Sequence, residues 1–374
     1  MDETLIILGP TAVGKTEVSI LLAEKIGGEI ISADAFQVYR GLDIASAKPS
    51  PRELARVPHH LIDILDLSEQ YTAARFRELA GPLIAEIWRR PAVPIVVGGA
   101  GLYIRVLVDG LFPGPAADRA CRDRLEREEN EKGPGYLHRL LGDVDPAAAR
   151  RIHPNNRKRI IRALEVYEAT GIPISRWQTQ WGRKDEHRTS NVQRPTSNDT
   201  GQRAERKEPG ALLAGKKPTT AHCPMSTAYI MVGLRRDRDD LYARINRRAE
   251  EMFERGLVEE TGRLLERGIR ENRIARQALG CKEAIGYLSG EYSREEAVRR
   301  LAANTRHLAR RQLTWWRKDQ RIRWVDLAPA DQPEDALAGV MDILDIGKNQ
   351  FALKRRYSMA KPERMSESDP ENKL

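Results

Sequence analysis

The feature that most constrains the fold is a glycine-rich segment close to the N-terminus. Residues Gly9–Thr16 read GPTAVGKT, which fits the pattern G-x-x-x-x-G-K-[S/T]. The apolar run Leu5–Leu8 precedes the segment, and Lys15–Ile26 follows it with the pattern of an amphipathic helix. A tight turn between a strand and a helix lets backbone N–H groups and the positive helix end surround phosphate oxygens. The sequence therefore predicts a polyphosphate-binding loop, with Lys15 at the terminal phosphate and Thr16 as a ligand of Mg²⁺.

Short apolar runs recur along the chain and alternate with glycine turns and helical stretches. Such an alternation predicts an α/β fold in which helices flank a parallel sheet. Ligands of such sheets bind beyond the carboxyl ends of the strands. We therefore expect Gly9, Asp34 and Gly98 to lie together at one edge. The predicted strands are Leu5–Leu8, Glu29–Ser32, Pro94–Val97, Tyr229–Gly233 and Ile322–Val325.

Composition divides the chain into a core, an insertion and two segments without a predicted fold. We expect the core, a phosphate-loop unit that ends in basic helices, in residues 1–116 and 226–346. Residues 117–182 are helical in pattern and strongly basic, which predicts an inserted all-α subdomain. Residues 183–225 and 347–374 are polar with few large apolar side chains, so we predict that they are disordered.

The chain has 374 residues, a net charge of +9 and three widely spaced cysteines. Three separate cysteines give neither a disulfide framework nor a metal-binding pattern, so we expect a cytoplasmic protein. No apolar stretch approaches the roughly 20 residues that cross a bilayer, so no membrane association is expected. We also expect a monomer, because no extended apolar surface repeat is evident. Charge alone leaves nucleic-acid binding and a solvated basic surface open.

Polar residues at the ends of predicted strands are candidates for chemistry. Asp34 follows the predicted strand Glu29–Ser32. A carboxylate there could ligate Mg²⁺, act as a general base or cap the next helical turn, and the spacing leaves these three roles open. His59 and His60 have no third metal ligand beside them, and we assign them to loop structure.

Basic residues gather in two helical regions. One cluster is Arg157–Arg162, at the start of a predicted helix. The other lies on one face of a helix beside Trp315 and Trp316, which suits an RNA backbone with stacked bases. Alternatively, the arginines form a solvated face and the tryptophans pack in the core. The arginines of this second cluster are Arg299, Arg306, Arg310 and Arg317.

Further motifs occur in a fixed order between Leu5 and Trp324. Together with Gly9–Thr16, this series resembles the bacterial tRNA dimethylallyltransferases of the IPP transferase family, interrupted only by residues 183–225. The motifs are Ile31–Pro49 (ISADAFQVYRGLDIASAKP), Pro58–Asp63 (PHHLID), Tyr71 with Phe76, Gly98–Tyr103 (GGAGLY), Arg151–Asn155 (RIHPN), Arg162–Glu165 (RALE), Asn304–Arg306 (NTR) and Arg311–Trp315 (RQLTW).

The resemblance implies transfer of a dimethylallyl group from dimethylallyl diphosphate to N6 of adenine 37, next to the anticodon of tRNAs that read codons starting with U. The products are N6-isopentenyladenosine and diphosphate. N6 is a weak nucleophile, so a base that accepts its proton helps, and Asp34 matches the family's base. Lys15, Thr16 with Mg²⁺, and Arg235 match groups that act on the diphosphate. The donor-binding positions match Gly9, Pro10, Thr11, Ala12, Val13, Gly14, Lys15 and Thr16.

The resemblance also implies contacts with the anticodon stem–loop of the tRNA. Two basic clusters beside a catalytic sheet suit a stem–loop whose target base turns inward. The matching positions follow two of the predicted strands and recur in the basic insertion. They are Asp34, Ala35, Phe36, Gln37, Ala100, Arg122, Lys158, Arg159, Ile160, Ile161 and Arg162.

The chain departs from the family pattern close to the expected chemistry. Ala35 and Ala100 replace a serine and a threonine, Ala45-Ser46 replaces Gly-Thr, and Cys281 stands where the family usually has tyrosine. The threonine helps to hold the reacting groups, and losing one charge-assisted hydrogen bond lowers a rate roughly ten- to a hundredfold. We therefore expect an active enzyme that is slower than its relatives.

Three other functions fit part of the sequence. A small-molecule kinase would use Gly9–Thr16 for a nucleoside triphosphate, and a related enzyme class prenylates free adenine nucleotides. Neither of these gives a use for the basic helices of residues 117–182. A tRNA-binding protein without catalysis would account for Ala35 and Ala100. Transfer of a labelled prenyl group to tRNA separates these alternatives from the enzyme.

Overall fold

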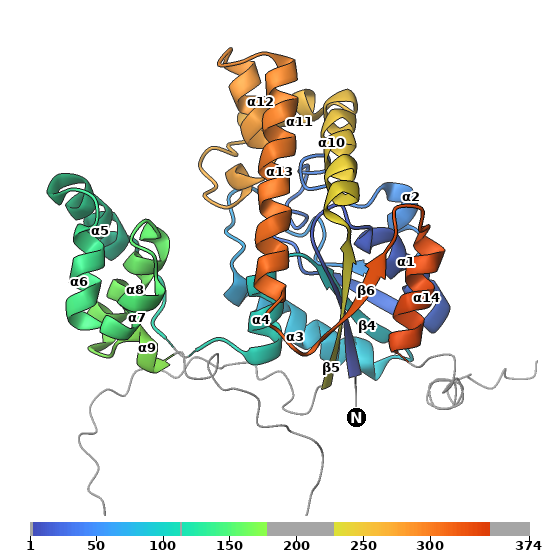
Figure 1. The fold of residues 1–374 in the computed structure, drawn as a ribbon, viewed down its shortest axis with the longest axis horizontal. Helices are drawn as coiled ribbons and strands as arrows, with labels where there is room; N and C mark the ends of the chain where they lie inside the picture. Colours follow the sequence, from blue (N-terminus) through green and yellow to red (C-terminus); the bar gives the residue numbers. More distant parts are fainter. Residues whose placement is uncertain (1–2, 113, 178–227, 345–374) are drawn as a thin grey trace, which may run out of the picture. The chain divides into compact units, whose positions relative to one another are not determined.

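A computed structural model describes residues 3–112, 114–177 and 228–344. Its centre is a six-stranded sheet in the order β3-β2-β4-β1-β5-β6, with every neighbouring pair parallel (Figure 1). This confirms the predicted α/β fold. The strands are β1 (Glu3–Leu8), β2 (Gly28–Ser32), β3 (His59–His60), β4 (Val93–Gly98), β5 (Ala228–Arg236) and β6 (Ile322–Leu327).

The described residues form two compact units, one of residues 3–108 and 228–344 and the other of residues 109–177. The first unit contains the sheet, the 3₁₀ helix η2 (Ala275–Gln277) and the helices α1 (Lys15–Ile26), α2 (Pro51–Leu54), α3 (Ala73–Arg89), α4 (Gly101–Asp109, ending at the boundary), α10 (Arg238–Glu254), α11 (Leu257–Glu266), α12 (Cys281–Leu288), α13 (Arg294–Trp316) and α14 (Pro333–Ile343). The second unit contains α5 (Arg119–Lys132), α6 (Tyr136–Val144), α7 (Pro146–Arg151), α8 (Arg157–Thr170) and α9 (Ile174–Trp177).

The sheet buries apolar side chains on both faces, as parallel sheets covered by helices do. Along β1, Ile6 and Leu8 point to the face that packs against α3 and α4. Leu5 and Ile7 point to the opposite face, which packs against α1 and α14. Because neighbouring residues of a strand point to opposite faces, both cores fix the register of β1. A fixed register in turn fixes where each strand ends.

The second unit has a small core of its own. Leu125 of α5, Leu141 of α6 and Leu164 of α8 are buried together. Asn156 caps helix α8 with its side chain, which accepts a hydrogen bond from the backbone N–H of Arg159, and the helix starts at the basic cluster Arg157–Arg162 as predicted. Three helices packed in this way keep the basic start of α8 at the surface of the unit.

One strand, β3, was not predicted from the sequence. His59 and His60, which we assigned to a loop, form β3 at an edge of the sheet and pair with Ile30 and Ile31. A strand of two residues is too short to show an apolar alternation. The predicted disordered segments 183–225 and 347–374 lie outside the described residues. Within the described ranges, no helix is long and apolar enough to cross a membrane.

A buried carboxylate fastens the segment after β2 to α11. The side chain of Glu260 accepts hydrogen bonds from the backbone N–H groups of Asp43 (3.1 Å), Ile44 (2.7 Å) and Ala45 (3.0 Å). Glu260 is only 3% exposed, so water is a poor substitute partner for these three N–H groups. Glu260 therefore ties three consecutive N–H groups of this segment to a helix that is distant in the sequence.

We expect Glu260→Ala to lower the free energy of unfolding by about 3 kcal/mol, because it leaves three backbone donors without their acceptor. Urea unfolding followed by circular dichroism measures this change. Glu259→Ala is the matched control, because Glu259 is exposed on the same helix turn and should change stability by less than about 0.5 kcal/mol. Equal stability of the two variants would contradict the assignment.

Candidate active site

The phosphate loop connects β1 to α1 at the carboxyl edge of the sheet. Gly9 has a φ of 152°, and a Cβ there would lie 2.5 Å from the carbonyl oxygen of Leu234. Gly14 has a φ of 108° at the start of α1. Ala12 also has a positive φ, of 65°. These turns curl the loop around the N-terminus of α1, which is the arrangement that binds phosphate oxygens.

The ends of β2 and β4 meet beside this loop. The order of the strands places β4 between β1 and β2. A Cβ at Gly98 would lie 2.2 Å from the carbonyl oxygen of Ala33, so only glycine permits this approach of the two backbones. Asp34, Gly98 and the loop thus share one edge, as expected.

Helix α13 holds the loop against β4 through one amide side chain. The Oε1 atom of Gln312 accepts a hydrogen bond from the backbone N–H of Thr11 (2.9 Å), and its Nε2 atom donates to the carbonyl oxygen of Gly99 (3.0 Å). From the sequence, Gln312 was predicted only as a member of the motif Arg311–Trp315. Its function here is to join two turns that are about 90 residues apart in the chain.

Lys15 folds back over the loop. Its Nζ atom donates to the carbonyl oxygens of Gly9 (3.1 Å) and Pro10 (2.8 Å). Burial lowers the pKa of Lys15 to about 8, although the negative charge of Asp34 favours the ammonium form; the positive charge of Arg248 adds to the lowering. An anion in the loop would stabilise the ammonium form and raise this pKa.

Asp34 uses one oxygen to hold its own turn. The Oδ1 atom accepts hydrogen bonds from the backbone N–H groups of Phe36 (2.8 Å) and Gln37 (3.3 Å). Burial raises the pKa of this carboxyl group, against the effect of these bonds and of the nearby charges of Lys15 and Arg248. The capping role therefore occupies one oxygen, and the same carboxylate can still act as a base through the other.

Three arginines of α10 and the end of β5 donate hydrogen bonds to the loop. Their contact with the loop was not predicted from the sequence. Arg248 donates to the Thr11 hydroxyl (3.4 Å), and Arg244 donates to the carbonyl oxygen of Ala12 (3.1 Å). Arg236 donates to the carbonyl oxygen of Val13 (3.2 Å). Burial lowers the pKa of Arg248, and the charge of Asp34 opposes that effect. The spacing of four between Arg244 and Arg248 is the sequence signal that could have revealed a shared helix face.

Arg235, which we expected at the diphosphate, lies elsewhere. Its guanidinium pairs with Asp326 and lies 5.6 Å from the ring centre of Trp324, both on β6. Successive residues of a strand point to opposite sides, so Arg236 faces the loop and Arg235 does not. This placement gives the expected role of Arg235 at the diphosphate no support, whereas Arg248 reaches the loop from α10.

The expected metal ligand Thr16 lies in the first turn of α1 and is half-buried. Its hydroxyl is a hard oxygen donor of the kind that Mg²⁺ accepts. Among the described residues, no group of three or more His, Cys, Asp or Glu could hold a metal ion.

The other residues expected to contact tRNA in the first unit are half-buried beside Asp34. Ala35, Phe36 and Ala100 pack against the core on the α3 side of the sheet. The amide of Gln37 accepts a hydrogen bond from the Ser32 hydroxyl (2.8 Å) and donates to the carbonyl oxygen of Ala47 (3.2 Å). These contacts hold Gln37 in place next to the proposed base.

In the second unit, the expected tRNA contacts divide into two groups. Lys158 and Arg159 are exposed at the start of α8. Ile160 and Ile161 are 1% and 5% exposed, so their side chains pack in the core of the unit, and their expected contact with tRNA stays a prediction. The helical pattern that exposes Lys158 and Arg159 turns the next two residues into the core.

Arg122 and Arg162 share one buried carboxylate. Arg122 binds both oxygens of Glu165 at 2.8 Å, and Arg162 binds one of them at 2.6 Å. The side chain of Glu165 is 1% exposed, whereas the side chains of Arg122 and Arg162 are 33% and 27% exposed. Two arginines against one carboxylate leave a net positive charge at this surface.

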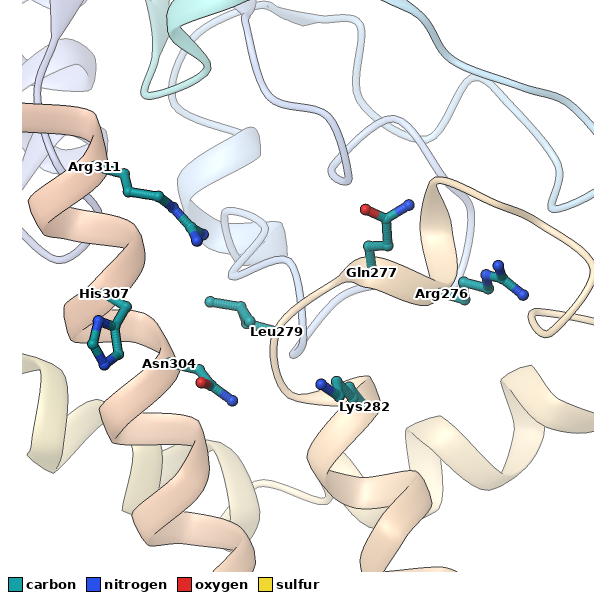
Figure 2. Close-up of a pocket in the computed structure, with 7 residues that line it drawn as sticks. All are labelled: Arg276, Gln277, Leu279, Lys282, Asn304, His307 and Arg311. Atoms are coloured by element: carbon teal, nitrogen blue, oxygen red, sulfur yellow. The ribbon is translucent and has the colours of Figure 1, made fainter. Parts of the chain in front are cut away.

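A basic pocket of about 360 Å³ lies between α13 and the segment from η2 to α12. Figure 2 shows Asn304, His307 and Arg311 on α13, opposite Leu279 and Lys282. Arg276 and Gln277 complete its lining. The spacing of three and four on α13 was a detectable signal, although we had singled out a different face of this helix.

The face that we had singled out is partly engaged within the protein. Arg306 donates to Asn246 and lies over the ring of Tyr242, both on α10, and Arg299 pairs with Glu296. Trp316 is buried in the core, as the alternative interpretation required. The side of α13 that lines the pocket therefore offers a basic surface to an anionic ligand in addition to the face that we had singled out.

Comparisons with known proteins identify the family to which this chain belongs. A family model described as IPP transferase matches residues 37–319. The tRNA dimethylallyltransferase of Geobacter sulfurreducens is 45% identical over 322 residues, which cover 86% of this chain and 91% of the relative. The enzyme of the same name from Desulforudis audaxviator is 42% identical and covers 91% of this chain and 97% of the relative.

Solved structures agree with this result. The tRNA isopentenylpyrophosphate transferase of Bacillus halodurans matches with a TM-score of 0.60 and 37% identity, over 96% of this chain and 99% of that chain. A eukaryotic dimethylallyltransferase acting on tRNA matches with a TM-score of 0.68 and 25% identity, over 97% and 87% of the two chains. Because the family model and these relatives span most of its length, the chain belongs to the IPP transferase family.

Proposed function

We propose that this protein transfers the dimethylallyl group of dimethylallyl diphosphate to N6 of adenine 37 in tRNAs that read codons starting with U. The relatives that carry the name tRNA dimethylallyltransferase support this function. The structural observation that carries it is the meeting of one carboxylate, Asp34, with two cations, Lys15 and Arg248, at one phosphate loop. A base and an anion site side by side are what this transfer requires.

The loop and its cations bind the diphosphate of the donor. Lys15 and Arg248 supply positive charge, and the N–H groups at the start of α1 supply donors. Negative charge grows on the departing oxygen as the bond from C1 of the prenyl group to that oxygen breaks. Groups already placed around this oxygen stabilise the transition state more than the ground state.

Asp34 acts as the base. As the N6 lone pair forms a bond to C1, the electron pair of the C1–O bond leaves with the diphosphate. The Oδ2 atom of Asp34 takes a proton from N6, while Oδ1 keeps its bonds to the backbone of the turn. A raised pKa makes this carboxylate a stronger base than an exposed aspartate.

Mg²⁺ fits the loop as a partner of the diphosphate. The hydroxyl of Thr16 would hold the ion, and the phosphate oxygens would supply further ligands. When bound, the ion would supply charge neutralisation on the leaving group. The absence of a carboxylate cluster around the loop among the described residues agrees with a cation that arrives with its substrate.

Two basic surfaces bind the anticodon stem–loop. The pocket beside α13 offers Arg276, Lys282 and Arg311, together with amides that can read base edges. In the second unit, Lys158 and Arg159 are exposed at the positive end of α8. Basic side chains at a helix N-terminus repel one another. Binding of a polyanionic partner offsets this repulsion and favours basic residues there. We further propose that the protein acts as a monomer in the cytoplasm.

The activity is tested by transfer of label. The protein is incubated with Mg²⁺, labelled dimethylallyl diphosphate and unmodified tRNA with adenines at positions 36 and 37, and the digested tRNA is searched for N6-prenyladenosine. We expect Asp34→Asn to lower turnover about a hundredfold or more while tRNA affinity changes less than about twofold. Asparagine keeps an oxygen for the N–H groups of Phe36 and Gln37 but accepts no proton.

Other outcomes of this assay identify the alternatives. Tight tRNA binding without transfer of label indicates a binding protein. Transfer to free AMP in place of tRNA indicates the enzyme class that acts on nucleotides. An unchanged rate for Asp34→Asn removes Asp34 as the base.

The pH dependence of kcat/KM should be bell-shaped. Asp34 must be ionised to accept a proton, so the rate rises with pH through its raised pKa. Lys15 must be charged to bind the diphosphate, so the rate falls as pH rises through about 8. Lys15→Arg should shift the alkaline limb upward, because a guanidinium stays charged. An alkaline limb that stays in place in this variant would exclude Lys15 as its cause.

Binding of inorganic pyrophosphate with Mg²⁺ distinguishes the role of Arg248 from that of Arg235. We expect Arg248→Ala to weaken binding roughly ten- to a hundredfold, because it removes a charge-assisted hydrogen bond. Arg235→Ala is the matched control and should leave the affinity unchanged, because its side chain pairs with Asp326. Isothermal titration calorimetry measures both. The reverse order of effects would restore the original assignment of Arg235.

A further inference from the structure

The buried carboxylate of Glu165 in the second unit is surrounded by hydrogen-bond donors. Its Oε1 atom accepts from the backbone N–H of Asp118 (2.6 Å) and from Nε of Arg122 (2.8 Å). Its Oε2 atom accepts from Nη2 of Arg122 (2.8 Å) and from Nη1 of Arg162 (2.6 Å). Four bonds fill the acceptor capacity of a carboxylate, so Glu165 has none left for a ligand.

This carboxylate brings two guanidinium groups together. Arg122 and Arg162 both donate to the same oxygen, and two positive charges at so short a separation repel each other unless a negative charge lies between them. Burial favours the neutral carboxyl group, but the hydrogen bonds from the two arginines and from the backbone of Asp118 outweigh it and hold the pKa of Glu165 below its usual value. The cluster therefore contains one negative and two positive charges.

Both arginines have a fixed orientation and remain accessible. The paired bonds from Arg122 to Glu165 fix the plane of its guanidinium group, which a single bond would not. Arg162 is held a second time, because its Nη2 atom donates to the carbonyl oxygen of Pro115 (2.8 Å) and its guanidinium carbon lies 5.7 Å from the ring centre of Phe112. The two arginine side chains are nevertheless 33% and 27% exposed.

Stability alone is a weak reason for such a cluster. Removing charges from water has a cost that offsets much of their attraction, and apolar side chains such as Leu125 and Leu164 fill the core of this unit without that cost. The cluster also continues a basic surface. Lys158 and Arg159 are exposed four and three residues before Arg162, and this spacing places them on the neighbouring turn of α8 on the same side.

We propose that Glu165 is a positioning residue for RNA binding, which holds Arg122 and Arg162 in the orientation that binds a backbone phosphate of the anticodon stem–loop and does not touch the RNA itself. This inference rests on the proposed function. Planar guanidinium groups form paired hydrogen bonds with phosphate oxygens, and this pairing depends on their orientation. A phosphate supplies the second negative charge that the two arginines lack. Side chains oriented in advance lose little conformational entropy when the RNA binds.

The test measures tRNA binding by full-length variants at several salt concentrations. If Glu165 acted only through its charge, its removal would strengthen binding of a polyanion, whereas removal of a positioning residue weakens it. We expect Glu165→Gln to raise the dissociation constant about tenfold and to reduce the steepness of its salt dependence by about one phosphate contact. Glu168→Gln is the matched control, because it removes the same charge from a 39% exposed position of the same helix. Its affinity should stay equal or rise.

Steady-state kinetics give an independent measurement. At saturating tRNA, Glu165→Gln should turn over as fast as the unsubstituted protein, while KM for tRNA rises about tenfold and KM for dimethylallyl diphosphate stays the same. Partial unfolding would instead lower kcat and leave KM for tRNA unchanged.

A second variant keeps the carboxylate in place. Arg122→Lys preserves the charge, but an ammonium group cannot form paired bonds with a carboxylate or a phosphate. We expect this variant to bind tRNA about tenfold more weakly, and the effect should shrink in a Glu165→Gln background because the two residues act together. Arg119→Lys, at an 83% exposed position of the same helix, should leave the affinity unchanged.

Each other outcome is decisive. Equal or tighter tRNA binding by Glu165→Gln, with transfer of label intact in the unsubstituted protein, overturns the inference alone. If circular dichroism shows that Glu165→Gln has lost helical structure, Arg122→Lys decides, and an unchanged affinity of that variant overturns the inference. Absence of transfer by the unsubstituted protein overturns the proposed function before any variant is compared.

Discussion

Three charges withdrawn from water, on Lys15, Arg248 and Asp34, govern the rest of this structure. Burial disfavours the charged form of each of them, and the attraction between Asp34 and the two cations opposes that tendency. The set carries one more positive than negative charge when all are ionised, so it favours an anion between them. The Gln312 bridge and the closely approaching backbones at Gly98 keep these groups together before any ligand arrives. Preorganised charge of this kind is effective in catalysis because it needs no rearrangement during the reaction.

Much of the fold and part of the site could be predicted from the sequence. The helix Lys15–Ile26 was predicted with its observed bounds, because an apolar run, a glycine turn and a helical pattern agree there. The strand of His59 and His60 left no signal, because it depends on a neighbour distant in sequence. Arg235 was chosen over Arg248 for a similar reason: the sequence shows that both are basic, and only the strand pairing and the path of α10 show which one reaches the loop.

The expected RNA contacts show a related limit. Arg122 and Arg162 are basic in sequence, yet the structure gives them a shared buried partner in Glu165, which sets their positions at the surface. On α13 the residues that line the pocket lie on a different face from the one we singled out. Counting basic residues along a helix predicts that a surface is positive. Which face of the helix borders a pocket depends on the neighbouring segment. For α13 this segment is the turn from η2 into α12.

The close approach of the Gly98 and Ala33 backbones limits which positions near the site can be substituted. The separation between the base and the phosphate loop is set by main-chain atoms, since the carbonyl oxygen of Ala33 occupies the place of a side chain at residue 98. The side chains that pack beside this contact can then change without altering the separation of the two backbones. Ala35 and Ala100 have the small apolar side chains that such freedom allows. Residue 98 has no comparable freedom, because any side chain there would separate the two strands that carry the chemistry.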